Sequence, residues 1–339
     1  MTDEGRFASQ FQTSICVLDL KEKIHLRRYI DWEWKHMEAY MRDHPNGTLG
    51  PTIIKHLALA GSHVTLLTRN PDKAAKQYPS PIETVLADYD STEALTSIFR
   101  EHGFESLVIL LNRRELQPQL RLIDAACSAG IGHVVPSSFG GDFSHPEVKR
   151  LPQLKEKLEM EDYLVQKADV GEICFTVINT GLFFDWALGG FLLPSDDTRR
   201  MMIADAGDVP VSGSTLDLIG QATAQAVLQR NESAVKNKFL YVHSTVFTQN
   251  QILEYARAAA PNGDIKTIKV DTEKMAKEAW EKYDAGERDQ KVLQPLMLRT
   301  SFGLGLGEFK KVDNDVLGVS MLSDDEVKSL VAKYAKRDM

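Results

Sequence analysis

Residues 46–72 read NGTLGPTIIKHLALAGSHVTLLTRNPD and carry the strongest structural signal in the chain. A glycine turn precedes an amphipathic helix, a short apolar strand follows the helix, and Arg69 ends the strand. Nucleotide-binding crossover units have this order, because backbone amides at the helix start hold phosphate and the next strand carries a cation towards the ribose. The stretch therefore predicts a dinucleotide site whose turn consists of Gly47, Thr48, Leu49 and Gly50.

The residues before this turn lack the strand that such a unit needs. A complete motif has a buried strand directly before the turn and a glycine at position 44, where this chain has His44. The apolar run Ser14–Leu20 could supply the strand from a distance. The other interpretation is a poorly packed extension. If the run does supply the strand, a long connection replaces the usual tight turn, and we expect weak cofactor binding.

Strands and helices alternate regularly after this unit. Short apolar runs predict strands, and longer runs with helical spacing predict the helices between them. Repeated strand, helix, strand order predicts an α/β fold with a doubly wound, Rossmann-like parallel sheet. The strands are expected at residues 64–68, 84–87, 107–111, 133–136 and 174–179, and the helices at 71–78, 91–102 and 116–129.

The second half of the chain predicts a smaller α/β lobe that binds substrate. Helices are expected over residues 216–229 and 249–259. Ser91, Thr248 and Thr272 are expected to cap helices, and Ser323 is expected to open the last helix. The expected division is an atypical N-terminal extension over residues 1–45 that replaces the usual first strand, an NAD(P)-binding domain over 46–178, and a substrate-binding lobe over 179–339.

Composition restricts the function classes. The chain has 339 residues, 43% of them apolar, and can bury a large core. The net charge of −8 is spread along the chain with no basic stripe, which disfavours direct nucleic-acid binding. No apolar run is long enough to span a membrane. Cys16, Cys127 and Cys174 have neither metal-ligand nor disulfide spacing, so no metal and a cytoplasmic location are expected.

The end of the second expected strand distinguishes the two nicotinamide dinucleotides. An acidic residue there would accept from a free ribose hydroxyl, whereas this chain has Thr68, Arg69 and Lys73. Two cations and a hydroxyl suit a ribose phosphate, so NADPH or NADP is the expected cofactor. The alternative is a solvated strand end with ordinary surface charges.

A loop rich in small residues follows the strand expected at 133–136. Because ligands bind at the carboxyl ends of parallel strands, Ser137, Ser138 and Phe139 are expected beside the nicotinamide. A serine hydroxyl could orient the carboxamide while Phe139 walls the ring. A plain turn built from serine and glycine would look similar.

These segments together resemble the NmrA-like and isoflavone reductase-like proteins, an atypical branch of the short-chain dehydrogenase/reductase superfamily, and most closely their fungal members. The resemblance extends over residues 46 to about 330. It implies an NADPH-dependent reductase of a small aromatic or apolar substrate, in secondary metabolism or detoxification. The segments that carry it are Gly47–Pro51, Leu67–Arg69, Gln119–Ala126, Pro136–Gly140, Asn179–Trp186 and Asp313–Gly318.

The resemblance also implies a catalytic role for Lys157. Reductases of the family place an active-site lysine on a helix at this position, near the nicotinamide. A partly desolvated lysine beside a cationic cofactor loses proton affinity and can exchange a proton with the substrate oxygen. The alternative is a surface ion pair with Glu161 one turn on, and the nearby Lys155 leaves the register open. Tyr163 and Lys167 imitate the Tyr-x-x-x-Lys spacing of short-chain reductases, but Tyr163 is expected to pack.

The resemblance carries over to the cofactor turn only in part. Gly47 and Gly50 match the later glycines of the family's turn, the first glycine has no match, and Arg69 matches the basic residue that favours NADPH. On the substrate side, Phe183, Phe184 and Trp186 follow the strand at 174–179 and could form an apolar substrate wall, or equally core.

Two classes of function remain from the sequence. The first is the NADPH-dependent reductase. The second is a non-catalytic redox sensor that binds NAD(P) and acts through a protein partner. A defective isoform is a third possibility because the turn is incomplete. The chain is expected to be a monomer or a homodimer.

Overall fold

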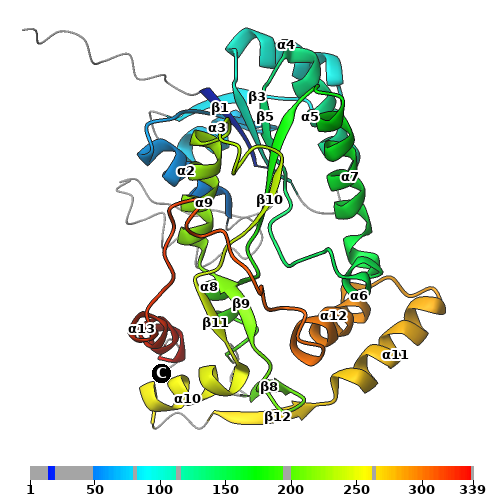
Figure 1. Cartoon of the computed structure of the whole chain (residues 1–339), viewed down its shortest axis with the longest axis vertical. Coiled ribbons are helices and arrows are strands. Elements are labelled where there is room, and N and C mark those ends of the chain that lie inside the picture. Colours follow the sequence, from blue (N-terminus) through cyan, green and yellow to red (C-terminus); the bar gives the residue numbers. More distant parts are fainter. Residues whose placement is uncertain are drawn as a thin grey trace, which may run out of the picture.

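The structure is a computed structural model that describes residues 14–19, 49–78, 82–111, 116–193, 200–261 and 265–336. The larger part of the fold is a parallel sheet with helices on both faces. A smaller lobe of helices and short strands lies beyond it (Figure 1). The strands are β1 (Ser14–Asp19), β2 (His63–Thr68), β3 (Glu83–Leu86), β4 (Ser106–Leu110), β5 (His133–Val135), β6 (Cys174–Asn179), β7 (Leu182–Phe183), β8 (Arg200–Ala204), β9 (Val211–Ser214), β10 (Lys238–Tyr241), β11 (Thr245–Phe247) and β12 (Lys266–Val270).

The helices connect these strands. They are α2 (Leu49–Leu59), α3 (Pro71–Gln77), α4 (Thr92–His102), α5 (Leu116–Ala129), α6 (Pro146–Lys149), α7 (Lys155–Asp169), α8 (Phe184–Leu188), α9 (Leu216–Leu228), α10 (Gln249–Ala259), α11 (Thr272–Asp284), α12 (Gln290–Leu298) and α13 (Asp324–Ala335). A 3₁₀ turn over Pro152–Leu154 precedes α7, and a π-helical turn over Arg299–Gly303 continues α12.

The main sheet has seven strands in the order β10-β6-β5-β4-β1-β2-β3, and every neighbouring pair is parallel. This confirms the predicted doubly wound sheet. The strand order reverses at β1, because β2 and β3 follow on one side and β4 to β6 on the other. The carboxyl ends of β1 and β4 therefore border the crevice in which such sheets bind ligands.

Strand β1 fills the place that the sequence left open. Val17 pairs with Leu66 of β2 on one side and with Val108 of β4 on the other. Of the two interpretations of Ser14–Leu20, the structure shows the strand supplied from a distance, over Ser14–Asp19, and Leu20 lies outside the described residues. A parallel sheet without its middle strand would leave both neighbouring ladders unpaired, which is costly in a buried sheet.

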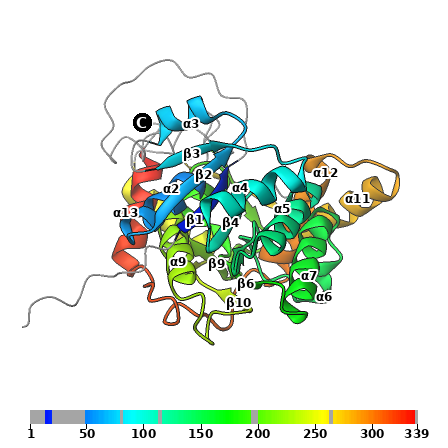
Figure 2. The same cartoon turned by 90° about the horizontal axis from the view of Figure 1, so that it is seen from above.

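Strands β2, β4, β5 and β6 each contribute to two cores, because successive side chains point to opposite faces. Val108 of β4 packs in the core under α2 and α9, whereas Leu107 and Ile109 pack in the core under α4, α5 and α7. Figure 2 shows α2 and α9 on one side of the sheet and α5 and α7 on the other. Apolar runs without polar alternation are typical of strands that are buried on both faces.

Helix starts mostly follow the predicted caps. The Ser91 side chain accepts from the Ala94 amide at the start of α4, and Thr248 and Ser323 cap α10 and α13. The predicted cap at Thr272 is wrong. Asp271 caps α11, because its carboxylate accepts from the Lys274 amide.

The smaller lobe contains a three-stranded sheet (β11-β9-β7), the strand pair β12-β8, and helices α8 and α10 to α13. It is closely joined to the main sheet, because α9 and β10 come from beyond residue 178 and yet belong to the sheet layer. The division at residue 178 and the N-terminal boundary at residue 45 stay predictions.

Candidate active site at the carboxyl edge of the sheet

Helix α2 begins at the switch point of the sheet. Leu49 is half-buried and Gly50 is buried at its first turn, whereas the predicted turn residues Gly47 and Thr48 lie outside the described part of the chain. The first turn of α2 has no acidic residue, so no side chain there neutralises the positive end of the helix dipole. This end of α2 can accept a phosphate group.

Arg69 is exposed at the end of β2, and its guanidinium carbon lies 5.3 Å from the centroid of the Tyr89 ring. Tyr89 is fully buried and donates its hydroxyl to the Leu67 carbonyl at 2.7 Å, so the ring is a fixed platform for the cation. The Thr68 hydroxyl accepts from the Asn70 amide at 3.1 Å. Sequence reasoning missed Tyr89, which is separated from Arg69 by the whole of β3.

The loop after β5 lies at the carboxyl end of its strand, next to the end of β4. The Ser137 hydroxyl donates to the Leu111 carbonyl at 2.7 Å and so ties the ends of β4 and β5 together. Ser138 is fully buried, and the Phe139 ring is 9% exposed within the core under α2 and α9. Two of the residues predicted to lie beside a nicotinamide differ in exposure. Ser137 is half-buried at the ends of β4 and β5, whereas Phe139 is buried in the core.

Lys157 is buried in the first turns of α7, with 8% of its surface exposed. Its Nζ donates to the Phe139 carbonyl oxygen at 2.9 Å and lies 5.0 Å from the centroid of the Phe143 ring. Lys155, in contrast, is exposed and lies 3.8 Å from Glu159. Lys157 is therefore the buried lysine of the two, and Lys155 faces solvent.

Glu161 is also buried, with 7% of its surface exposed, so the proposed surface ion pair between Lys157 and Glu161 does not describe this helix face. Burial raises the pKa of Glu161 above its usual range, against the effects of the Ser138 hydrogen bond and the Lys157 charge. Tyr163 lies elsewhere: its hydroxyl donates to Asp124 of α5 at 2.5 Å. Tyr163 packs, as predicted.

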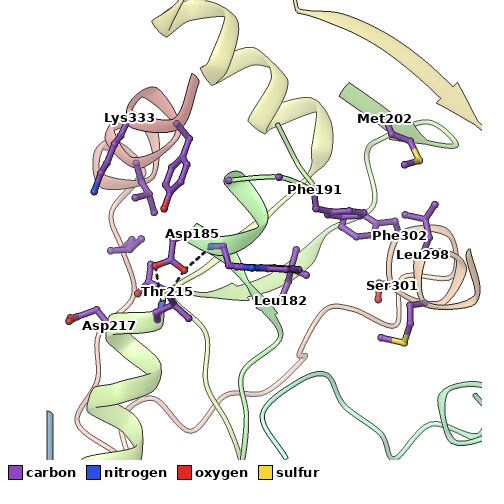
Figure 3. Close-up of a pocket in the computed structure, with 18 of the residues that line it drawn as sticks. Leu182, Asp185, Phe191, Met202, Thr215, Asp217, Leu298, Ser301, Phe302 and Lys333 are labelled. Atoms are coloured by element: carbon purple, nitrogen blue, oxygen red, sulfur yellow. Dashed lines mark hydrogen bonds between the residues drawn. The ribbon is translucent and has the colours of Figure 1, made fainter. Parts of the chain in front are cut away.

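A pocket of about 1320 Å³ lies among β7, α8, the start of α9, α12 and α13 (Figure 3). Phe191, Leu298 and Phe302 line one side, and Asp185, Thr215 and Lys333 lie on the other. Burial raises the pKa of Asp185 to about 6, while its hydrogen bonds from the Leu216 and Trp186 amides act in the opposite direction. The pocket therefore combines an apolar wall with the half-buried carboxyl group of Asp185.

The three aromatic residues predicted as a substrate wall separate in the structure. Trp186 is 44% exposed and lines the pocket. Phe184 is fully buried, with its ring centroid 4.9 Å from that of Phe247, so it forms core. Phe183 is half-buried and packs against the core under α2 and α9. Consecutive residues at a strand exit point in different directions, which the sequence pattern does not reveal.

A short backbone link connects the surroundings of Lys157 to this pocket. The Gly140 carbonyl accepts from the amides of Thr180 and Gly181 at 2.8 and 2.9 Å, and the next residue, Leu182, lines the pocket. Lys157 itself does not line it. Gly181 has φ +64°, and a Cβ atom added at this position would lie 2.3 Å from the Ser212 carbonyl oxygen. The link therefore requires glycine.

Two further properties concern the described residues alone. Within these ranges no helix has the length and apolar composition of a membrane span. They also contain no group of three or more His, Cys, Asp or Glu side chains that could hold a metal ion.

Three features define a Rossmann-like dinucleotide-binding fold. They are the parallel sheet that reverses at β1, the first turn of α2 without an acidic residue, and the cation at the end of β2. The chain belongs to the NmrA-like family, whose model matches residues 45–263. The resemblance inferred from the sequence is thereby confirmed.

Known proteins with similar sequence or structure agree with this assignment. The chain is 27% identical to the oxidoreductase aprR of Aspergillus flavus over 297 residues, which are 85% of this chain and 96% of that protein. Leucoanthocyanidin reductase from Vitis vinifera, in its binary complex with NADPH, has a TM-score of 0.68 at 15% identity, over 95% of this chain and 99% of that chain. Triphenylmethane reductase from Citrobacter sp., complexed with NADP(H), has a TM-score of 0.65 at 19% identity, with the same two coverages.

Proposed function

We propose that this protein is an NADPH-dependent oxidoreductase that transfers hydride to a small aromatic or otherwise apolar substrate. The observation that carries the proposal is the position of Lys157, a buried ammonium group held on the Phe139 carbonyl at the carboxyl edge of the sheet. Burying a charged group is costly, and such groups concentrate where chemistry needs them. The two solved neighbours, which are reductases by name, hold NADPH and NADP(H).

The residues around the switch point fit a phosphorylated dinucleotide. The start of α2 offers backbone amides with no acidic side chain in its first turn, and suits the pyrophosphate. Arg69 on Tyr89 suits the ribose phosphate, and Thr68 and Lys73 flank it in the sequence. Bound NADPH would supply the hydride.

Lys157 supplies the proton in this proposal. Reduction of a carbonyl or a polarised alkene adds one hydride and one proton to the substrate, and a positioned side chain delivers the proton as a general acid. The Lys157 ammonium gives up one N–H proton and becomes a neutral amine, the form that burial favours. Water restores the proton after product leaves.

The pocket beside Leu182 is the proposed substrate site. Its volume of about 1320 Å³ and its side chains Trp186, Phe191 and Phe302 suit a substrate with one or more aromatic rings. A substrate of this class fits secondary metabolism or detoxification, and the relative from Aspergillus flavus is an oxidoreductase by name. The free thiols Cys127 and Cys174 fit a reducing compartment such as the cytoplasm.

NADPH consumption tests this function. Wild-type protein and Lys157→Met are compared over a panel of aromatic carbonyl and alkene compounds, with Lys155→Met as the control because Lys155 is exposed on the same helix. Turnover is expected in wild type and Lys155→Met, and its loss in Lys157→Met. NADPH binding without any turnover, together with a captured protein partner, would instead support a redox sensor.

A further inference from the structure

Ser138 directly precedes Phe139, whose carbonyl holds Lys157, and it hydrogen-bonds to a second buried ionisable group. Glu161 is one helical turn from Lys157, on the same face of α7, because residues four apart on a helix share a face. The hydroxyl of the fully buried Ser138 donates to Glu161 Oε1. A carboxyl group this deeply buried needs such a partner, since its charge is otherwise costly.

Three consecutive loop residues fix the positions of both groups. Ser138 holds Glu161, the carbonyl of Phe139 holds the Lys157 ammonium at 2.9 Å, and Gly140 leaves room for it. A Cβ at Gly140 would lie 3.4 Å from Lys157 Nζ and 3.0 Å from Phe143 Cζ. The loop therefore fits closely around the ammonium group and the carboxyl group together.

The charges that face Glu161 come from several elements. Lys157 and Asp162 lie on α7, and Lys149 lies on α6; the two lysines favour its ionised form, and Asp162 opposes it. Lys149 and Asp162 are exposed, so solvent screens their effects. Lys157 is therefore the buried charge with which Glu161 interacts.

Strand β10 adds a tyrosine to this cluster. The Tyr241 hydroxyl donates to Asp142 Oδ1 at 3.2 Å. Burial raises the pKa of Tyr241, and the charges of Asp142 and Glu161 raise it further. Tyr241 therefore stays a neutral donor, and Lys157 is the positive group of the cluster.

We propose that Glu161, held by Ser138, is a positioning residue that keeps Lys157 protonated until the hydride reaches the substrate. The inference rests on the proposed function and adds a second ionisable residue to it. An ionised carboxyl group close to an ammonium group favours the protonated amine. Above the raised pKa of Glu161 the carboxyl group is ionised, and its negative charge then favours the return of a proton from water to Lys157 after the substrate has taken one.

The variant Glu161→Gln tests the inference. Glutamine removes the negative charge and keeps an oxygen that accepts from Ser138. The matched control is Glu159→Gln, the same chemical change on the same helix, because Glu159 is exposed and interacts with Lys155. Ser138→Ala is the second variant if Glu161→Gln does not fold.

The main readout does not depend on activity. Trace labelling with acetic anhydride over a range of pH, followed by mass spectrometry of the peptide that contains Lys157, gives the pH at which this lysine loses its proton in NADPH-free protein. The second readout is the pH profile of NADPH oxidation. A purely structural role of Glu161 would lower the amount of folded protein without moving either midpoint.

Glu161→Gln is expected to lower the midpoint of Lys157 by about one pH unit, with a smaller decrease in Ser138→Ala and no change in Glu159→Gln. The basic limb of the pH profile is expected to move by the same amount. An unchanged midpoint in both Glu161→Gln and Ser138→Ala overturns the inference, whether or not the protein oxidises NADPH. A moved midpoint without any NADPH oxidation overturns the proposed function and supports the link between the two side chains.

Discussion

Asp185 and Leu216 are joined across 31 residues, because both carboxylate oxygens of Asp185 accept from the Leu216 amide at 3.2 and 3.1 Å. The contact ties α8 to the first turn of α9, which Thr215 caps. A helix start favours a negative charge, whereas burial disfavours it. Burial has the larger effect and raises the pKa of Asp185 to about 6.

We expect Asp185 to make the protein less stable as pH rises from about 4 to about 6. Its pKa is about 6 in the folded protein and near 3.8 when unfolded, so the folded state binds more protons in this interval. The free energy of unfolding therefore falls as pH rises, by on the order of 2 kcal/mol for this group. Urea unfolding of wild type and Asp185→Asn at several pH values checks this. A decrease of equal size in both proteins would contradict it.

Asp217 is expected to change the stability of the protein with pH in the opposite direction to Asp185, because its pKa is lowered. The hydrogen bond from His56 at 2.8 Å is the main effect that lowers its pKa to about 2. Its contribution to stability is therefore present above about pH 4 and lost as pH falls towards 2. Asp217→Asn is expected to be less stable than wild type at neutral pH and to approach it at low pH.

Gly220 allows α9 to pack directly on α2. A Cβ there would lie 2.6 Å from His56 Cδ2 and 2.9 Å from the Thr52 carbonyl oxygen. Alanine favours helix over glycine by about 1 kcal/mol, but overpacking of this kind costs about 1–3 kcal/mol. Gly220→Ala is therefore expected to lower the free energy of unfolding. Gly190→Ala, where a Cβ meets nothing within 4 Å, is the control and should unfold at nearly the wild-type urea concentration.

Arg69→Ala is expected to weaken binding of NADPH more than binding of NADH. The exposed guanidinium on Tyr89 suits a ribose phosphate, which NADH lacks. Loss of one charge-assisted contact of this kind costs about 1.5–3 kcal/mol, which corresponds to a roughly 10- to 150-fold increase in the dissociation constant for NADPH. Fluorescence titration with both dinucleotides measures the two constants. Equal losses of affinity for NADPH and NADH would show that the ribose phosphate does not bind at Arg69.

Wild-type protein is expected to bind NADPH weakly. Strand β1 ends at Asp19 and α2 begins at Leu49, whereas a strand and the following helix are usually joined by about 2–6 residues. Closing a long connection costs more entropy than closing a short one. The same titration measures the affinity, and a submicromolar dissociation constant would contradict this prediction.

Local periodicity was enough to predict most elements. The helix Leu116–Ala129 and the strand Cys174–Asn179 have the predicted bounds, because an apolar stripe and an apolar run each identify one kind of element. The slot of Ser14–Asp19 in the sheet could not be predicted, since the order of strands is a property of their tertiary contacts. The cap of α11 could not be predicted either, because Asp271 and Thr272 are adjacent and both residue types are able to cap a helix.

The site was predictable to a smaller extent. Arg69 and Lys157 came from position and resemblance, and the structure places both at the carboxyl edge of the sheet. The sequence offers Glu161 only as the partner in an alternative surface ion pair with Lys157, because helical spacing does not show which face of α7 is buried. The contact between Ser138 and Glu161 joins residues 23 positions apart and left no local pattern.

The central place of β1 has a consequence for how this protein is made. A polypeptide whose translation started at Met37 or Met41 would keep every other strand of the sheet and yet lack the one between β2 and β4. In such a product the edges of β2 and β4 that pair with β1 would have unpaired backbone N–H and C=O groups. The product is therefore expected to aggregate or be degraded. Translation that begins downstream of β1 is therefore expected to yield a product without a complete sheet.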